Sequence, residues 1–148
     1  MAITGGCLCG GVHYEITGPL FAASHCHCSM CRQQHGAAFA TYAKFDAGDF
    51  KWISGEDLVK VYQTSSGAGW CFCSECGSSL AAADKGRVTS VTLGTIDSDP
   101  GIAVESHIFT GSMAPWHEIT DNLPQFEEWP ADAWETQGKA HGKSVQPD

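Results

Sequence analysis

Seven of the eight cysteines fall into three short groups, and this pattern limits the fold more than any other feature of the sequence. The groups are Cys7-Leu8-Cys9, Cys26-His27-Cys28-Ser29-Met30-Cys31 and Cys73-Ser74-Glu75-Cys76. Tetrahedral zinc takes four thiolate or imidazole ligands, and closely spaced ligand pairs let a short turn present two sulfur atoms to one ion. Seven grouped thiols divide into four plus three. The sequence therefore predicts one closed, structural zinc site and a second site with a position open to water or substrate.

A disulfide framework is the main alternative use of these cysteines, and it requires an oxidising compartment. The segment from Met1 to Gly6 has no basic region and no apolar run, so we expect no secretory signal and a cytoplasmic location. No apolar stretch approaches the length of a membrane span. Cys7 and Cys9 would lie about 6.6 Å apart on a strand, near the upper limit for a disulfide. An iron centre with four sulfur ligands is a further alternative that spacing does not exclude.

Length and charge narrow the classes of partner. A chain of 148 residues is expected to form one domain with its own core, so zinc is not needed merely because the protein is small. The formal net charge is −9, from 17 acidic and 8 basic residues, and metal-bound thiolates would make it more negative. Phosphate backbones and anionic membranes would be repelled. We therefore expect neither a nucleic-acid nor a membrane partner.

Short apolar segments between glycine-rich turns predict a mostly β domain with no long amphipathic helix. The predicted strands are rich in β-branched and aromatic residues. They are Val12 to Ile16, Phe21 to Ser24, Ala38 to Phe45, Phe50 to Ser54, Leu58 to Thr64, Trp70 to Cys73, Ser79 to Ala82, Val88 to Leu93 and Ile102 to Phe109. The last stretch, Gly138 to Asp148, is polar and is predicted to be a flexible tail.

One segment predicts a short helix within the middle cysteine group. Ser29 can cap a helix that runs through His35, and Gly36 stands where that helix would end. Cys31 would then lie in the first turn, where the helix dipole favours a thiolate. The outer groups instead end in Cys9-Gly10 and Cys76-Gly77, where glycine permits the positive φ of a tight knuckle.

From the residues alone, we infer that Cys7 and Cys9 share one zinc ion with Cys73 and Cys76. Cys26, Cys28 and Cys31 would hold the second ion. A histidine could complete that second site and close it, and the candidates are His25, His27, His35, His107 and His117. Alternation along a strand points His25 and His27 away from the neighbouring cysteines. An open site and a closed Cys₃His site are both compatible with the residues alone.

Three segments resemble the glutathione-dependent formaldehyde-activating (GFA) family, which includes centromere-protein-V-like members. They are Gly6-Cys7-Leu8-Cys9-Gly10-Gly11-Val12, then His25 to Arg32 leading to Gly36-Ala37-Ala38-Phe39, then Phe72-Cys73-Ser74-Glu75-Cys76-Gly77-Ser78-Ser79-Leu80. Trp116, Ile119, Asp121, Leu123, Pro124 and Phe126 are similar to the C-terminal segment of that family. The resemblance implies a GFA-type zinc-binding domain over residues 3–129, followed by an extension over residues 130–148.

The resemblance also implies a fold and an activity. The fold would be a β-tent of coiled antiparallel sheets, with zinc knuckles and one short helix at the second zinc site. Cys7, Cys9, Cys73 and Cys76 would hold the structural zinc, and Cys26, Cys28 and Cys31 the functional zinc. The implied enzyme is a carbon–sulfur lyase that forms or cleaves S-hydroxymethylglutathione from glutathione and formaldehyde, or a related thiol–carbonyl adduct. The alternative function is a zinc-stabilised binding or interaction module without turnover.

Other conspicuous residues are expected to have ordinary roles. Cys71 is interpreted as a small buried core residue, and Asp121 and Glu127-Glu128 as a turn and a solvated edge. The tryptophans are expected to pack in the core or at its rim: Trp52, Trp70, Trp116, Trp129 and Trp134. Four residues near the middle cysteine group are candidates for holding a carboxylate or relaying a proton, although surface roles are expected for each: Ser29, Arg32, Gln34 and His35.

Overall fold

A small three-stranded sheet forms one side of the molecule. The computed structural model describes residues 2–130, and in it β1 (Ile3–Gly6) pairs with β2 (His13–Ile16), which pairs with β5 (Phe50–Ser54). Both pairings are antiparallel. Tyr14 and Ile16 alternate with more exposed residues along β2 and are fully buried, as a half-buried strand requires. One face of this sheet therefore packs on the rest of the protein.

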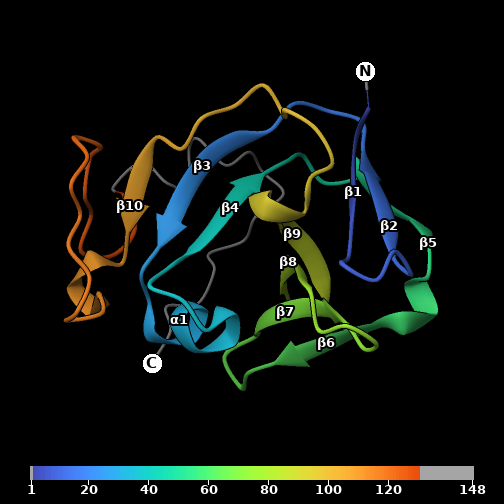
Figure 1. The fold of residues 1–148 in the computed structure, drawn as a ribbon, viewed down its shortest axis with the longest axis horizontal. Helices are drawn as coiled ribbons and strands as arrows, with labels where there is room; N and C mark the ends of the chain where they lie inside the picture. The colour runs from blue at the N-terminus through green and yellow to red at the C-terminus, as the bar shows by residue number, and fades with distance from the viewer. Residues whose placement is uncertain (1, 131–148) are drawn as a thin grey trace.

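A seven-stranded sheet forms the body of the molecule, in the order β10-β3-β4-β9-β8-β7-β6. Every neighbouring pair is antiparallel except β10 with β3, which is parallel. The strands are β3 (Phe21–Cys26), β4 (Ala40–Lys44), β6 (Val59–Gln63), β7 (Ala68–Cys73), β8 (Ser79–Asp84), β9 (Arg87–Thr92) and β10 (Ser106–Ile108). Figure 1 shows this sheet strongly coiled, with β3 and β4 crossing diagonally toward β6 and β7.

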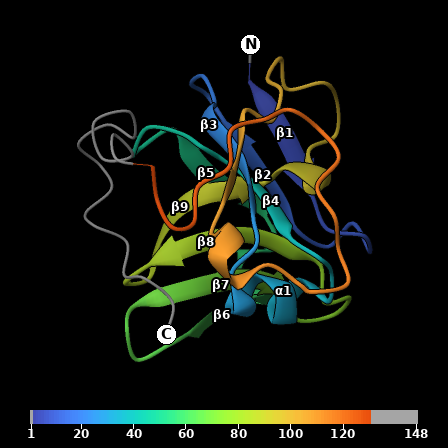
Figure 2. The same cartoon turned by 90° about the vertical axis from the view of Figure 1, so that its left-hand side faces the viewer.

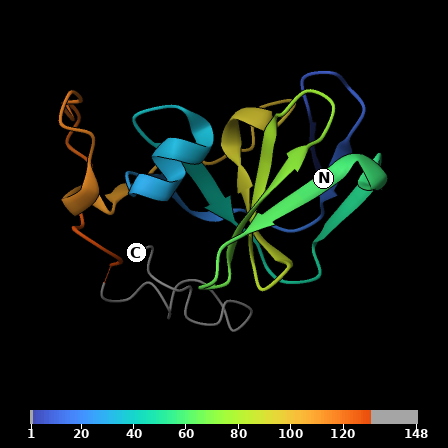
Figure 3. The same ribbon diagram turned by 90° about the horizontal axis from the view of Figure 1, so that it is seen from below.

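Short helical segments connect the strands. The helix α1 (Ser29–His35) follows β3, and it lies at the lower end of β3 and β4, close to β7 (Figures 1 and 2). Seen from below, α1 stands between the segment that contains β10 and the strands β6 and β7 (Figure 3). The 3₁₀ helices are η1 (Glu56–Leu58), η2 (Leu93–Thr95) and η3 (Thr110–Ser112).

The main core lies between the two sheets. It includes Tyr14 and Ile16 on β2 and Val12 just before that strand. These residues pack with Leu80 on the large sheet and with Phe45, which directly follows β4. A second cluster lies on the other face of the large sheet and includes the middle cysteine group. The large sheet is therefore covered on both faces, which suits its β-branched and aromatic composition.

The fold agrees with the predicted mostly β class, with two sheets, one short helix and clustered cysteines. Two strand predictions need correction. The strand β1 was not predicted, and the predicted strand from Ile102 to Phe109 contains only the short β10. The predictions for Trp134 and for Gly138 to Asp148 concern residues outside the described range. Within that range, no helix is both long and apolar enough to span a membrane.

Candidate metal centres and the adjoining cavity

The outer cysteine group brings together two segments that are far apart in the sequence. Cys7 and Cys9 follow β1, while Cys73 ends β7 and Cys76 lies in the turn before β8. The four sulfur atoms lie within 4.8 Å of one another. Cys7 Sγ is 3.5 Å from Cys9 Sγ, which is 3.8 Å from Cys73 Sγ. Four thiolates bound tetrahedrally to zinc at about 2.3 Å would have sulfur atoms about 3.8 Å apart, so this group fits a zinc ion.

Each pair in the outer group lies on a glycine-containing knuckle. Gly10 and Gly77 both have φ of +78°, in the left-handed region that favours glycine, as predicted. The Gly77 N–H donates to the Cys73 carbonyl at 2.8 Å, which closes the second knuckle. In the first knuckle, the backbone N–H of Val12 donates to Cys7 Sγ at 3.2 Å. Such N–H···S bonds orient a sulfur atom and stabilise its thiolate form.

The inner cysteine group (Cys26, Cys28 and Cys31, the middle group of the sequence) is formed by one short segment. Cys26 is the last residue of β3, Cys31 lies in α1, and all three sulfur-bearing residues are buried. The helix itself was predicted, but its cap was assigned to the wrong residue. Cys28, rather than Ser29, is the N-cap, and its sulfur accepts a hydrogen bond from the Cys31 N–H at 3.3 Å. Gly36 ends the helix in the left-handed conformation, as predicted.

The three inner sulfur atoms lie within 4.8 Å of one another, so ionisation of one thiol disfavours ionisation of the other two. Hydrogen bonds from the Cys26 and Cys31 thiols lower the pKa of Cys28 to about 3. Hydrogen bonds to Cys28 and Cys31, together with burial, raise the pKa of Cys26 well above its usual value. Without a cation the group therefore favours one thiolate and disfavours the others. A divalent cation would relieve the repulsion between three thiolates, so the donor set fits a metal ion.

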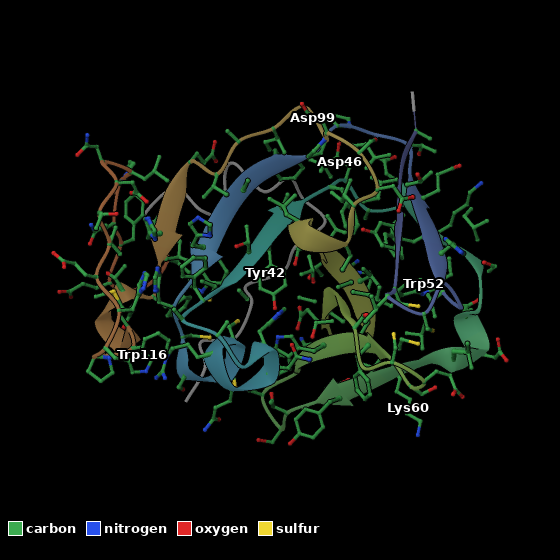
Figure 4. All side chains as sticks on the ribbon, viewed as in Figure 1. Tyr42, Asp46, Trp52, Lys60, Asp99 and Trp116 are labelled. Atoms are coloured by element: carbon green, nitrogen blue, oxygen red, sulfur yellow. The ribbon has the colours of Figure 1, made fainter. Side chains whose placement is uncertain are left out.

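No histidine, aspartate or glutamate of residues 2–130 joins the inner group within 4.8 Å. The histidine on α1, His35, instead places its Nε2 2.9 Å from the Tyr42 hydroxyl. That hydroxyl also accepts a hydrogen bond from Trp70 Nε1 at 3.0 Å and lies 3.9 Å from Cys31 Sγ. Tyr42 thus links the helix, the sheet and the cysteine group, and Figure 4 shows it between β4 and the sulfur atoms beside α1. The sequence reasoning did not single out Tyr42.

Four histidines, His25, His27, His107 and His117, gather on the opposite face of β3, as alternation along the strand predicted for His25 and His27. The rings of His25 and His27 both contact Phe39 and His107. Asp121 makes the turn contact expected of it and a further contact that the sequence did not indicate. Its carboxylate does accept the Leu123 N–H, but it also lies 2.9 Å from His107 Nε2.

A hydrogen-bonded chain runs from this carboxylate into the protein. His107 Nδ1 lies 2.8 Å from Nε2 of the fully buried His27. Burial, with His107 adding to the effect, lowers the pKa of His27 to about 4. The hydrogen bond from His107 lowers the pKa of Asp121. These contacts therefore connect His27, which lies between Cys26 and Cys28, to Asp121 in the segment after η3.

A cavity of about 120 Å³ adjoins the inner cysteine group, on the same face of the large sheet. One buried water needs roughly 10–15 Å³ by this measure, so the cavity has room for several heavy atoms of a ligand. Its walls include the aromatic residues Tyr42, Trp70, Phe109 and Trp129. The cavity gives a small molecule access to the three sulfur atoms.

The remaining predicted residues lie mostly where expected. Cys71 is buried with two alanines, as predicted, and Glu127 and Glu128 are exposed. Trp116 was expected to pack in the core or its rim, but 72% of it is exposed. Two further candidate residues lie on or near α1 without entering the cysteine group. Gln34 accepts a hydrogen bond from Ser79, and Arg32 Nε is buried without a hydrogen-bond partner.

Three comparisons relate this chain to known proteins. The sequence model of the family described as "Glutathione-dependent formaldehyde-activating enzyme" matches residues 2–112. A protein of Halomonas elongata named "Putative glutathione-dependent formaldehyde-activating enzyme" is 30% identical over 130 residues, covering 80% of this chain and 82% of the relative. The crystal structure of a Rhodobacter sphaeroides protein aligns with a TM-score of 0.53 and 25% sequence identity. That alignment covers 65% of this chain and 89% of the other.

Proposed function

Because this chain belongs to the family of glutathione-dependent formaldehyde-activating enzymes, we propose that it is a zinc-dependent carbon–sulfur lyase. It would join a thiol such as glutathione to a small carbonyl compound such as formaldehyde, or cleave the resulting adduct. The observation that supports this proposal best is the group Cys26, Cys28 and Cys31, three buried sulfur atoms beside a cavity with room for a ligand.

The two cysteine groups would have different roles. Cys7, Cys9, Cys73 and Cys76 supply four sulfur ligands, which complete a tetrahedral zinc site and make it structural. The inner group supplies three, and a zinc ion held there would acidify a thiol that enters the fourth position. Free thiols in both groups suit a reducing compartment, which is why we propose a cytoplasmic location. The catalytic domain would span residues 3–129, because two residues beyond 112 pack onto the rest of the fold. Asp121 contacts His107, and Phe126 packs against the cluster that contains the inner cysteines.

The reaction balances without an oxidant or a further reactant. The thiol loses its proton, its sulfur attacks the carbonyl carbon, and the carbonyl oxygen takes a proton to become a hydroxyl group. The reverse reaction breaks the carbon–sulfur bond and restores both reactants. The protein would contribute mainly by holding the two reactants together in the cavity, with Tyr42 and Trp70 as fixed walls.

The test must separate catalysis from the uncatalysed addition of thiols to aldehydes. Exchange spectroscopy by NMR on an equilibrium mixture of glutathione, formaldehyde and their adduct measures the interconversion rate directly. We expect the zinc-loaded protein to accelerate exchange, and Cys28→Ala to abolish the acceleration and reduce bound zinc from two ions to one. Cys71→Ala removes a buried thiol outside both groups and is the matched control. Two bound zinc ions without faster exchange would refute the lyase and favour a binding module.

A further inference from the structure

The cavity beside the inner cysteine group has a charged end. Lys44, the last residue of β4, and Asp84, the last residue of β8, both line it. Between this end and the sulfur atoms, the walls are mainly apolar and aromatic, including Trp70 and Phe109. A cavity with sulfur atoms at one end and both a cation and a carboxylate at the other would suit an elongated ligand with unlike ends.

Strand register sets the distance between the two ends. Ala40 pairs with Cys26 at the sulfur end, and Lys44 pairs with Phe21 four residues further along the same pair of strands. At about 3.3 Å per residue, the backbone positions of Ala40 and Lys44 are roughly 13 Å apart. Because a lysine side chain can reach back along the cavity, a ligand would have its charged end somewhat less than this distance from its sulfur atom. Cysteine itself is too short to span the cavity.

The charges at this end act on each other and are partly withdrawn from water. Asp84 Oδ1 is buried and accepts no hydrogen bond. Burial lowers the pKa of Lys44 to about 8, and the Asp84 carboxylate opposes that shift. Lys44 Nζ also lies 5.2 Å from the centre of the Trp129 ring, which holds the ammonium at the cavity wall. A buried carboxylate oxygen without a donor is costly, and a ligand ammonium group would satisfy it.

We propose that Lys44 and Asp84 form a subsite for an α-amino-acid terminus, with Lys44 binding the carboxylate and Asp84 the ammonium group of an elongated thiol. This inference rests on the proposed function, because it places the thiol sulfur at the inner cysteine group. The net charge of the chain points the same way, since −9 disfavours a ligand that brings several uncompensated negative charges. A zwitterionic end adds no net charge and matches both residues.

The test measures thiol binding by the absorbance of cobalt-substituted protein, which reports sulfur coordination without requiring turnover. Three C6 alkyl thiols differ only in their far end: 6-mercaptohexanoate carries a carboxylate, 6-aminohexanethiol an ammonium, and 6-mercaptohexanol neither charge. The fourth probe, γ-glutamylcysteine, carries an α-amino acid at its far end, together with an amide and a carboxylate beside its thiol. We expect γ-glutamylcysteine to bind most tightly. Lys44→Met and Asp84→Asn should each weaken it roughly ten- to hundredfold, as expected for charged hydrogen bonds.

The neutral probe is the internal control for folding and for access to the metal, and neither variant should change its affinity by more than about twofold. Asp84→Asn should also strengthen binding of 6-mercaptohexanoate, because it removes a carboxylate near Lys44. Lys51→Met, at an exposed lysine paired with Glu15 on the small sheet, is the matched control for loss of one positive charge.

The two proposals fail in different ways. If wild-type protein binds the thiols but both variants affect all four probes equally, or affect none, the subsite is wrong and the thiol site stands. If no thiol changes the cobalt spectrum, the proposed lyase and the subsite are both overturned.

Discussion

The Tyr42 hydroxyl is expected to contribute more to stability than an ordinary buried tyrosine hydroxyl, because two side chains share it. Trp70 Nε1 donates to it at 3.0 Å, and His35 Nε2 lies 2.9 Å from it. In Tyr42→Phe both partners lose their hydrogen bond. A buried group left without a partner costs about 1–3 kcal/mol. Trp70 is buried and bears this cost in full, whereas His35 is half-buried and can recover part of it from water.

We therefore expect Tyr42→Phe to lower the free energy of unfolding by about 2–4 kcal/mol. Tyr14→Phe is the matched control, because that buried hydroxyl has one partner, Thr95 Oγ1, at 2.8 Å. Thr95 also donates to the Thr92 carbonyl, so it keeps a hydrogen bond in the control variant. The loss of one ordinary hydrogen bond should cost about 0.5–1.5 kcal/mol.

Urea unfolding of both zinc-loaded variants, followed by circular dichroism, measures this difference. In a thermal scan, Tyr42→Phe should melt roughly 5–15 °C below the wild type, given about 2–4 °C per kcal/mol for a domain of this size. Zinc content should be determined in parallel, because Cys31 Sγ is 3.9 Å from the hydroxyl. Equal costs for the two variants, at unchanged zinc content, would refute the idea that Tyr42 is a shared hydrogen-bond partner.

Three further predictions concern other parts of the fold. Cys76→Ala should lose one zinc ion and unfold or melt far earlier, since structural zinc contributes about 10–16 kcal/mol in small finger peptides, whereas Cys71→Ala should keep both ions by elemental analysis. Gly5→Ala should destabilise the protein by about 1–3 kcal/mol in urea, because a Cβ there would collide with the tyrosine ring of β2, while Gly94→Ala has open space and should cost less. The lowered pKa of Asp121 adds stability that is present above about pH 4 and is lost as the pH falls through its folded value. Asp121→Asn should therefore be less stable than wild type at pH 7, and the gap in unfolding free energy should narrow below pH 4; a gap independent of pH would contradict this assignment.

Local patterns predicted most of the strands, the inner cysteine group and each of the two pairs that form the outer group. Phe50 to Ser54 was predicted with the bounds that β5 has, because its β-branched and aromatic residues stand between clear turn signals. The glycine after each outer cysteine pair indicated a knuckle for a reason that holds in the structure, a positive φ. These features depend on short stretches of sequence, which is why they were readable without the fold.

Features that depend on contacts between residues far apart in the sequence could not be predicted from it. The strand β1 contains two glycines and a threonine, and it forms because Gly5 fits against Tyr14 and pairs in register with β2. The role of Asp121 depends on His107, which lies 14 residues earlier, on β10. Lys44 and Asp84 share a cavity only because β4 and β8 flank β9 in the sheet. No local pattern indicates such neighbours.

The span of each cysteine group also sets the order in which the two groups can form during translation. The inner group is complete within six consecutive positions, so it can be assembled as soon as that short stretch leaves the ribosome. The outer group joins Cys9 to Cys73 across 64 positions. Half of its thiols must therefore wait, exposed on a nascent chain, until the second knuckle has been synthesised. A metal ion held by all four thiols would therefore bind after the inner group is already complete on the nascent chain.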